Sequence, residues 1–412
     1  MTQDSPPAQA LSTAFDGDLL TDYVPDALGA VDVRRLLSIG RPLDDEPFRV
    51  GHLRVPLARR AEVIPVVSCA ARARMLRLTE QALSDHVPRP EVFSYRSLNW
   101  QYRPAYQARQ RHLRALAARA DLPLVLVLDV HRFSRSLPLD VLVRAPWMTE
   151  RLAGALTALH TAAGRGLLPG HRWASRLATA ALAPLDDTVA SYAPGRWARW
   201  GDDLHVFVRD QDEADDIRAA AAITLQQLGL RLSAEKSTVT KAASVLAGPA
   251  HIIEGRPEEV WRSGLADGDV RNLRFALFRT PPVDTVSRTL VGAVRDRPGL
   301  LPRAVHYLDR AVHSPLGQAA AKELLRTSEP DAFTAARLLP LAARHPALLP
   351  AVPDALTEVG DRSEFVPLRE LACRVGALRG RPHMRPPTPR MRRWLAQGAP
   401  SHSQMPEVST LL

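Results

Sequence analysis

The chain has 412 residues, which at about 100–200 residues per domain predicts two or three domains. Apolar residues make up 46% and charged residues 24%, a composition that excludes a mostly disordered chain. The net charge of +10 favours a polyanionic partner, most often nucleic acid. Because the chain has no run of about 18 apolar residues and no basic segment ahead of an apolar N-terminal core, we expect neither a membrane span nor a signal peptide. Two cysteines, Cys69 and Cys373, are too few for a disulfide framework or a zinc site, so we expect a cytoplasmic protein.

The first half of the chain mixes strand and helix signals. Residues 47–120 are rich in arginine and combine short apolar runs with helical periodicity. The continuously apolar stretch 124–128 is typical of a strand that is buried on both faces. Helices are predicted over 149–163, 174–183 and 213–228. Two short strands are predicted within 199–208, and a third over 230–232.

The second half is predicted to be helical throughout. Helix-length segments follow one another between proline and glycine breaks, and we find no strand signal among them. This pattern favours stacked helical hairpins of the solenoid type. The segments cover 302–313, 317–327, 331–344, 347–358 and 365–378, and one more helical turn is expected over 391–395.

Three acidic residues lie at positions where a charged carboxylate is energetically unfavourable, because it adjoins a buried strand or a second carboxylate. Asp129 directly follows the buried strand, and Asp202 and Asp203 lie together between two short strands. A bound metal would relieve the repulsion between them. Mg²⁺ prefers oxygen ligands, and two such ions about 4 Å apart catalyse in-line phosphoryl transfer. The structural alternative is an ordinary Asp-Asp turn, with Asp129 as a helix or turn cap.

Four segments, in this order, resemble the palm motifs of reverse transcriptases. The first has an apolar strand, Asp, three further residues and Phe. The second has Leu-Pro and an Ala-Ser-Arg-Leu helix, and the third joins a basic and an aromatic residue to Asp-Asp and a strand. In the fourth, a lysine follows a short Leu-rich strand. The segments are LVLDVHRFSRSL (126–137), LLPGHRWASRLATAALAPLD (167–186), RWGDDLHVFV (199–208) and GLRLSAEKSTV (229–239).

The resemblance covers about residues 50–240, and VFSYRSLNW (92–100) is similar to a fingers element of bacterial abortive-infection and defence-associated reverse transcriptases. It implies an α+β right-hand polymerase of fingers and palm, followed by an all-α helical-repeat domain. The implied parts are an N-terminal lead-in (1–46), a fingers-like region (47–120), a palm (121–240), an α-helical thumb or repeat domain (241–380) and a basic, proline-rich tail (381–412).

The resemblance also implies roles for individual residues. Asp129, Asp202 and Asp203 would hold two Mg²⁺ ions, with Mn²⁺ as the alternative metal. Lys236 would lie near the incoming triphosphate as a charge or proton donor; the alternative is a solvated loop lysine.

A second group of residues would contact nucleotide or nucleic acid. Ser175 and Arg176 would place the incoming nucleotide and the template, the alternative being helix capping and a surface ion pair. Arg96 is a phosphate contact or a plain surface arginine. Ser134 occupies the position where most family members carry a large aromatic residue that blocks a ribose 2′-hydroxyl. We therefore expect weakened discrimination against ribonucleotides, unless Phe133 fills the gap.

The implied function is RNA-directed DNA synthesis from dNTPs in antiphage defence, with an RNA template or non-coding RNA and a DNA product as partners and an oligomer left open. In the second motif, His171 stands where the family has Gly, which predicts unusual templating. Gly201 ahead of the Asp pair also resembles RNA-dependent RNA polymerases. RNA polymerase, template-independent nucleotidyl transferase and non-catalytic nucleic-acid-binding helical scaffold remain the alternatives.

Overall fold

The computed structural model describes residues 33, 48, 50–56, 61–164, 166–168, 171–246, 256–381 and 386–396. The fold mixes helices with two small antiparallel sheets, which agrees with the predicted α+β class at that level. Among the described residues, the chain divides into two compact units. The sheet unit contains residues 70–246, and the helical unit contains residues 50–69 and 256–396.

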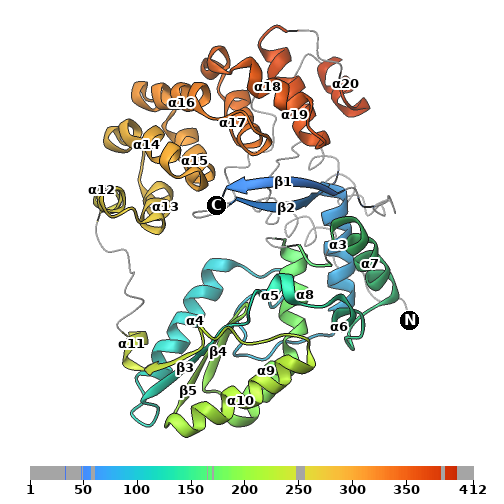
Figure 1. The fold of residues 1–412 in the computed structure, drawn as a ribbon, viewed down its shortest axis with the longest axis vertical. Helices are drawn as coiled ribbons and strands as arrows, with labels where there is room; N and C mark the ends of the chain where they lie inside the picture. The colour runs from blue at the N-terminus through green and yellow to red at the C-terminus, as the bar shows by residue number, and fades with distance from the viewer. Residues whose placement is uncertain are drawn as a thin grey trace. The chain divides into compact units, whose positions relative to one another are not determined.

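A four-stranded antiparallel sheet forms the centre of the sheet unit, with the strand order β4-β5-β3-β6. The predicted buried strand is β3, in which Val125, Leu126 and Leu128 are buried. In the view of Figure 1, α4 lies on one side of this sheet and α9 and α10 lie on the other. The strands are β3 (Leu124–Leu128), β4 (Trp197–Trp200), β5 (Asp203–Val208) and β6 (Thr238–Lys241).

Two long helices of the sheet unit, α7 (Glu150–Ala163) and α10 (Gln211–Gln227), begin at capping side chains that the sequence provides. The side chain of Thr149 accepts a hydrogen bond from the Leu152 amide at the start of α7, which ends at Gly164 with a positive φ of 71°. Asp210 caps α10 in the same way. The helices are α3 (Cys69–Ala82), α4 (Tyr102–Ala117), α5 (Phe133–Ser136), α6 (Leu139–Val143), α7 (Glu150–Ala163), α8 (Arg172–Ala181), α9 (Ala183–Tyr192), α10 (Gln211–Gln227) and α11 (Ala243–Leu246).

Successive helices build most of the helical unit, as the sequence predicts. Their apolar faces share one core, in which Leu290, Leu308 and Leu339 are fully buried. The elements are α12 (Pro257–Asp267), α13 (Val270–Arg279), α14 (Asp284–Asp296), η2 (Pro298–Leu300), α15 (Leu301–Ala311), α16 (Pro315–Thr327), α17 (Ala332–Arg344), η3 (Pro346–Ala351), α18 (Asp354–Asp361), α19 (Val366–Leu378) and α20 (Pro389–Ala396).

The helical unit also contains a β-hairpin from far upstream. Strands β1 (Val50–Pro56) and β2 (Ala61–Val67) pair antiparallel, and Leu53 and Ile64 join the core of the helices. The hairpin contacts α17, and the His52 amide donates to Glu364 Oε1 at 2.8 Å. The region 47–120, predicted as one fingers-like part, is thus divided between the two units. Local sequence reveals the strands' apolar face but not the distant helices that cover it.

Two element predictions needed correction. The strand predicted over 230–232 is a single bridge between Leu232 and Val130, and the fourth strand of the sheet is β6, which had been missed. The helix predicted over 347–358 is broken by Pro353 into η3 and α18. The helical turn predicted over 391–395 is confirmed by α20. None of the helices in the described ranges has the length and hydropathy needed to cross a bilayer.

Candidate active site

The sheet brings Asp129 and Asp203 face to face. Strand β3 pairs with β5 up to Leu128 opposite Leu204, so one further step of the same register puts Asp129 opposite Asp203. Directly opposed residues on antiparallel strands point to the same face, with Cβ atoms about 4.5–5.5 Å apart. The two carboxylates that the sequence separates by more than 70 positions are therefore neighbours because of strand pairing alone.

Asp202 lies at the tip of the hairpin that joins β4 to β5. Trp200 pairs with Asp203, which leaves Gly201 and Asp202 as a two-residue turn. Gly201 has a φ of +64°, the left-handed conformation that the first central residue of such a turn requires. This geometry places two carboxylates at the end of the hairpin, next to the strand end that carries Asp129.

Backbone hydrogen bonds bring Lys236 to the same place. The Ser233 amide donates to the Asp129 carbonyl at 2.8 Å, and the His131 amide donates to the Arg231 carbonyl at 2.9 Å. The turn that follows presents Lys236, whose Nζ donates to Asp129 Oδ2 at 3.2 Å. The lysine side chain is mostly exposed, whereas Asp129 is buried. Lys236 is therefore a cation that solvent, or a phosphate, can reach.

A buried arginine fixes the aspartate hairpin from the opposite face of the sheet. Arg199 donates to both carboxylate oxygens of Asp186 on α9, each at 2.6 Å. The same guanidinium donates to the carbonyls of Gly201 at 2.8 Å and Thr179 at 3.1 Å. Arg199 and Asp186 are both buried, so this forked ion pair ties the turn to two helices. From the other side, the Gly201 amide donates to Ser94 Oγ at 2.7 Å.

The segment that contains Ser94 is held in turn by arginines of α8. Arg176 forms a buried forked ion pair with Glu80, at 2.9 and 3.2 Å, and donates to the Tyr95 carbonyl at 2.9 Å. Arg172 donates to the carbonyls of Leu98 and of Trp100, the latter at 2.7 Å. The Arg199 amide and carbonyl also pair with residues 91–93, which adds this segment to the edge of β4. These hydrogen bonds hold residues 91–100 in place beside the turn that carries Asp202 and Asp203.

Partial burial and mutual repulsion disfavour the charged forms of Asp202 and Asp203. Burial, followed by the charges of Asp203 and Asp129, raises the pKa of Asp202 above its usual value. Burial and the charge of Asp129 likewise raise the pKa of Asp203. The charge of Lys236 opposes both shifts. An added cation would favour the charged forms of Asp202 and Asp203 and so oppose these shifts.

A second cation stands behind Asp203. Arg109 on α4 is 8% exposed, and its guanidinium lies 3.2 Å from His205 Nδ1. Burial, followed by the charge of Arg109, lowers the pKa of His205 to about 4, which keeps this ring neutral. Arg109 interacts electrostatically with Asp203, so the trio is flanked by Lys236 and by Arg109.

The donor set fits Mg²⁺ in its chemistry. Three carboxylates provide the hard oxygen ligands that this ion prefers, and Asp129 already accepts one cation, the ammonium of Lys236. Across the described ranges, however, no three His, Cys, Asp or Glu side chains stand close enough together to enclose an ion. Asp129, Asp202 and Asp203 would hold the metal only after their side chains converge further.

The remaining candidate residues differ in how far they are buried and in their hydrogen-bond partners. Arg176 is 3% exposed inside the ion pair with Glu80, not at the surface, so this conformation gives it a structural role. Arg96 donates to the Pro88 carbonyl at 3.4 Å and is half-buried. Phe133 is buried at the start of α5, and Ser175 is half-buried on α8. The side chain of Ser134, like residues 169–170 of the second motif, is outside the described part.

Sequence reasoning missed the residues that hold the aspartates in place. Arg199 and Ser94 lie within segments that resemble reverse-transcriptase motifs. No feature of the neighbouring sequence indicates that both side chains bind the backbone of Gly201. Arg109 lies on a helix with four arginines and no acidic residue, and that bias was the available signal. His171, noted as a departure, is buried and stacks on Trp173 with ring centroids 6.2 Å apart.

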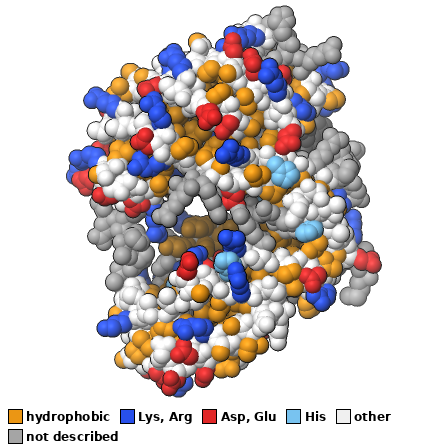
Figure 2. Space-filling view, viewed as in Figure 1, with side chains coloured by type: hydrophobic (Ala, Val, Ile, Leu, Met, Phe, Trp, Pro, Cys, Tyr) orange, Lys and Arg blue, Asp and Glu red, His pale blue; other side chains and the backbone are white. Residues whose placement is uncertain are grey.

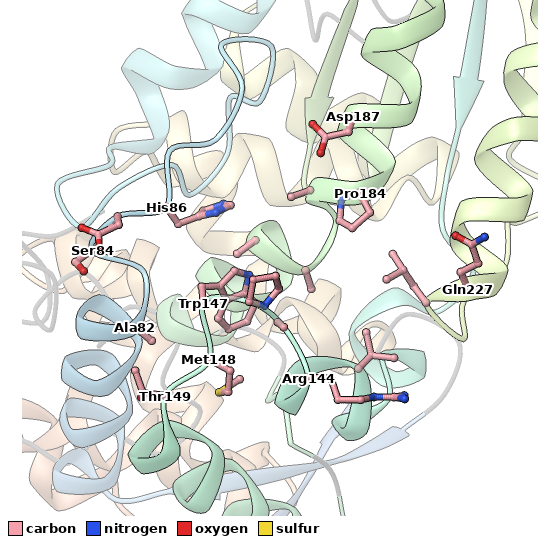
Figure 3. A pocket seen from close by; sticks show the side chains of 18 residues that line it. Ala82, Ser84, His86, Arg144, Trp147, Met148, Thr149, Pro184, Asp187 and Gln227 are labelled. Atoms are coloured by element: carbon pink, nitrogen blue, oxygen red, sulfur yellow. The ribbon is translucent and has the colours of Figure 1, made fainter.

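A cavity of about 810 Å³ lies elsewhere in the sheet unit. Its lining comes from the end of α3, the segment before α7, the start of α9 and the end of α10. Figure 3 shows His86 from the chain after α3, Trp147 from the segment before α7 and Pro184 from the start of α9 facing this space. None of the site residues predicted from the sequence lines it. Comparison with protein-family models and with curated proteins finds no match to this chain.

Proposed function

We propose that this protein is a right-hand polymerase of the reverse-transcriptase type that joins dNTPs to a hydroxyl primer and acts in antiphage defence. The observation that carries the proposal is the pairing of β3 with β5. It sets Asp129 opposite Asp203, with Asp202 at the adjoining turn and Lys236 on Asp129. The order of the four sequence motifs supports the same assignment.

The protein's own residues would act in the following way. Asp129, Asp202 and Asp203 would hold two divalent ions, which supply charge neutralisation of the phosphates and a lower pKa of the primer hydroxyl. Lys236, whose side chain is exposed, would move from Asp129 to the triphosphate and support the leaving pyrophosphate. Arg199 and Ser94 would keep the turn rigid while the reacting groups align.

Primer extension with purified full-length protein tests the proposal. We expect dNTP incorporation in Mg²⁺, and we expect Asp202→Ala and Asp203→Ala to lower it by about 10³-fold or more, because metal stabilisation of the transition state amounts to several kcal/mol. The matched control is Asp187→Ala, which removes an exposed aspartate that pairs with Arg89. Activity that survives loss of both active-site aspartates would refute the proposal.

Parallel reactions with rNTPs and without template separate the alternatives. Ser134 favours the RNA polymerase, since a small residue leaves room for a 2′-hydroxyl. Preferred use of rNTPs would then replace the first proposal. Synthesis without template would identify a template-independent transferase. The non-catalytic scaffold is favoured by the incomplete convergence of the carboxylates, and nucleic-acid binding without any incorporation would support it.

A further inference from the structure

An exposed aromatic cluster adjoins the aspartate turn. Tyr102 and Tyr106 lie one turn apart on α4, with rings 6° from parallel and centroids 5.8 Å apart. Tyr102 is 60% exposed and Tyr106 37% exposed, so the two stacked rings present an exposed aromatic surface. Both rings meet Trp200 edge to face, at 5.3 and 5.7 Å. The tyrosines are thus supported from one side and open to solvent on the other.

Two connections tie this cluster to the aspartates. Trp200 is the strand partner of Asp203, so the two side chains share one face of the hairpin. On α4, residues three and four apart share a face, which aligns Tyr102, Tyr106 and Arg109 in that order. Arg109 is the buried cation that interacts with Asp203. The aromatic surface and the carboxylates therefore belong to one continuous face.

The charge around the cluster selects the kind of ligand. Helix α4 carries four arginines and no acidic residue, and the exposed Arg103 lies three residues before Tyr106 and therefore beside it. Flat aromatic faces beside arginines are the arrangement that binds single-stranded nucleic acid, in which bases stack and phosphates meet cations. Elsewhere, on the face drawn in Figure 2, basic side chains are scattered among hydrophobic and acidic ones.

We propose that Tyr102, Tyr106 and Trp200 form a stacking platform for the unpaired bases of a single-stranded nucleic acid that enters the aspartate site. This inference deepens the proposed function and rests on it for the role of the strand. Stacking itself needs neither metal nor catalysis. Tyr102 presents the most exposed ring and takes the outermost base, and Trp200 holds the rings in place.

Binding of oligonucleotides with and without bases tests the platform. The full-length protein is titrated, in EDTA, with a fluorescent oligo-dT strand and with an abasic strand of equal phosphate number. Phosphate contacts are the same in both, so stacking predicts tighter binding of the strand with bases. Tyr102→Ala and Tyr106→Ala should each weaken oligo-dT binding by about 5- to 150-fold, with little effect on the abasic strand. Oligo-U in place of oligo-dT shows whether RNA is taken as well.

Three further variants distinguish the possible outcomes. Tyr102→Phe keeps the ring and should bind as the wild type does. Tyr192→Ala removes a tyrosine on α9 whose exposure, 47%, lies between those of Tyr102 and Tyr106, and it should change nothing. Asp202→Ala should abolish synthesis while preserving the preference for bases, which separates this inference from the proposed function. Equal affinity for both strands, or equal losses on both in Tyr102→Ala, would overturn the platform.

Discussion

At the scale of residues, the site depends on ion pairs that are almost completely buried. The guanidinium groups of Arg199 and Arg176 each donate hydrogen bonds to one carboxylate and to nearby backbone carbonyls. Such pairs contribute little net stability compared with apolar replacements, but losing one partner is costly. Their benefit is geometric, because a planar fork fixes both the carboxylate and the turn carbonyl in one orientation.

Replacing Arg199 with Ala should destabilise the sheet unit by about 3–5 kcal/mol, since it leaves the Asp186 carboxylate buried without its partner. Urea denaturation provides the measurement. Arg209→Ala is the control, because Arg209 pairs with Glu213 at the surface and is 66% exposed there. That variant should lose about 1 kcal/mol or less. Similar losses in the two variants would contradict the anchoring role of Arg199.

At the scale of elements, the hairpin β1–β2 depends on close packing against the helical unit. A Cβ atom on Gly51 would stand 2.2 Å from the ring of Phe365, which is itself buried. This approach has no room for any side chain, so glycine is required here for space and not for its φ angle.

Gly51→Ala should therefore destabilise the helical unit by about 1–3 kcal/mol, the usual cost of overpacking. Gly154→Ala is the matched substitution, because a Cβ there meets nothing within 4 Å and the residue lies inside α7. It should stabilise the sheet unit by about 0.5–1 kcal/mol. Hydrogen exchange resolves the two units separately, and opposite signs are expected. A neutral Gly51→Ala would show that Phe365 can move aside.

A second element contact responds to pH. Asp309 on α15 accepts hydrogen bonds from Arg344 Nε at 3.0 Å and His345 Nε2 at 2.7 Å. Burial alone would raise the pKa of Asp309, but the bond from His345 and the charge of Arg344 hold it below the usual value. The folded state thus favours the charged form, so this stabilisation is complete above about pH 4 and is lost as pH falls through the lowered pKa.

Asp309→Asn should cost the helical unit about 1.5–3 kcal/mol at pH 6, the range for a hydrogen bond to a charged group. The difference from wild type should shrink as the pH falls below 4. Amide exchange in α15 and α17, followed from pH 6 to pH 3, tests both statements. A difference that stays constant with pH would indicate that charge has no part in the contact.

Local periodicity was enough to predict the elements that carry a strong apolar pattern, but not the short polar strand β6 and not which elements pack together. The strand 124–128 and the helices 149–163 and 213–228 were confirmed because each carries its own apolar pattern and end signals. The strand 238–241 is short and largely polar, so its pairing with β3 left no trace in hydropathy. Similarly, the sequence around Arg176 is compatible with a surface position, and only the packing of α8 in the structure reveals its buried ion pair with Glu80. The order of the sequence motifs was enough to select Asp129, Asp202 and Asp203 as candidate ligands. Only the strand register of the structure shows that they lie close together.

At the scale of the whole molecule, the charge of +10 bears on every encounter with a polyanion. If a single strand displaces about four counterions on binding, log affinity should fall with log salt at a slope of about −3. Anisotropy titrations between 50 and 200 mM salt measure this slope. Arg103→Ala should reduce its magnitude by less than one, whereas Tyr102→Ala should leave it unchanged. A slope near zero would exclude phosphate contacts as the basis of binding.

The upstream hairpin in the helical unit also affects how the chain is made. Strand β2 ends at Val67 and helix α12 begins at Pro257, so roughly 190 residues separate the hairpin from the first helix of the helical unit, and α17, which contacts the hairpin, comes later still. At about 5–20 residues per second, a ribosome needs on the order of 10–40 s to reach that first helix. Until the helices of that unit have been made, Leu53 and Ile64 have no core to enter, whereas the sheet unit has all its strands once β6 has been made. We therefore expect the upstream hairpin to reach its native packing after the sheet unit does.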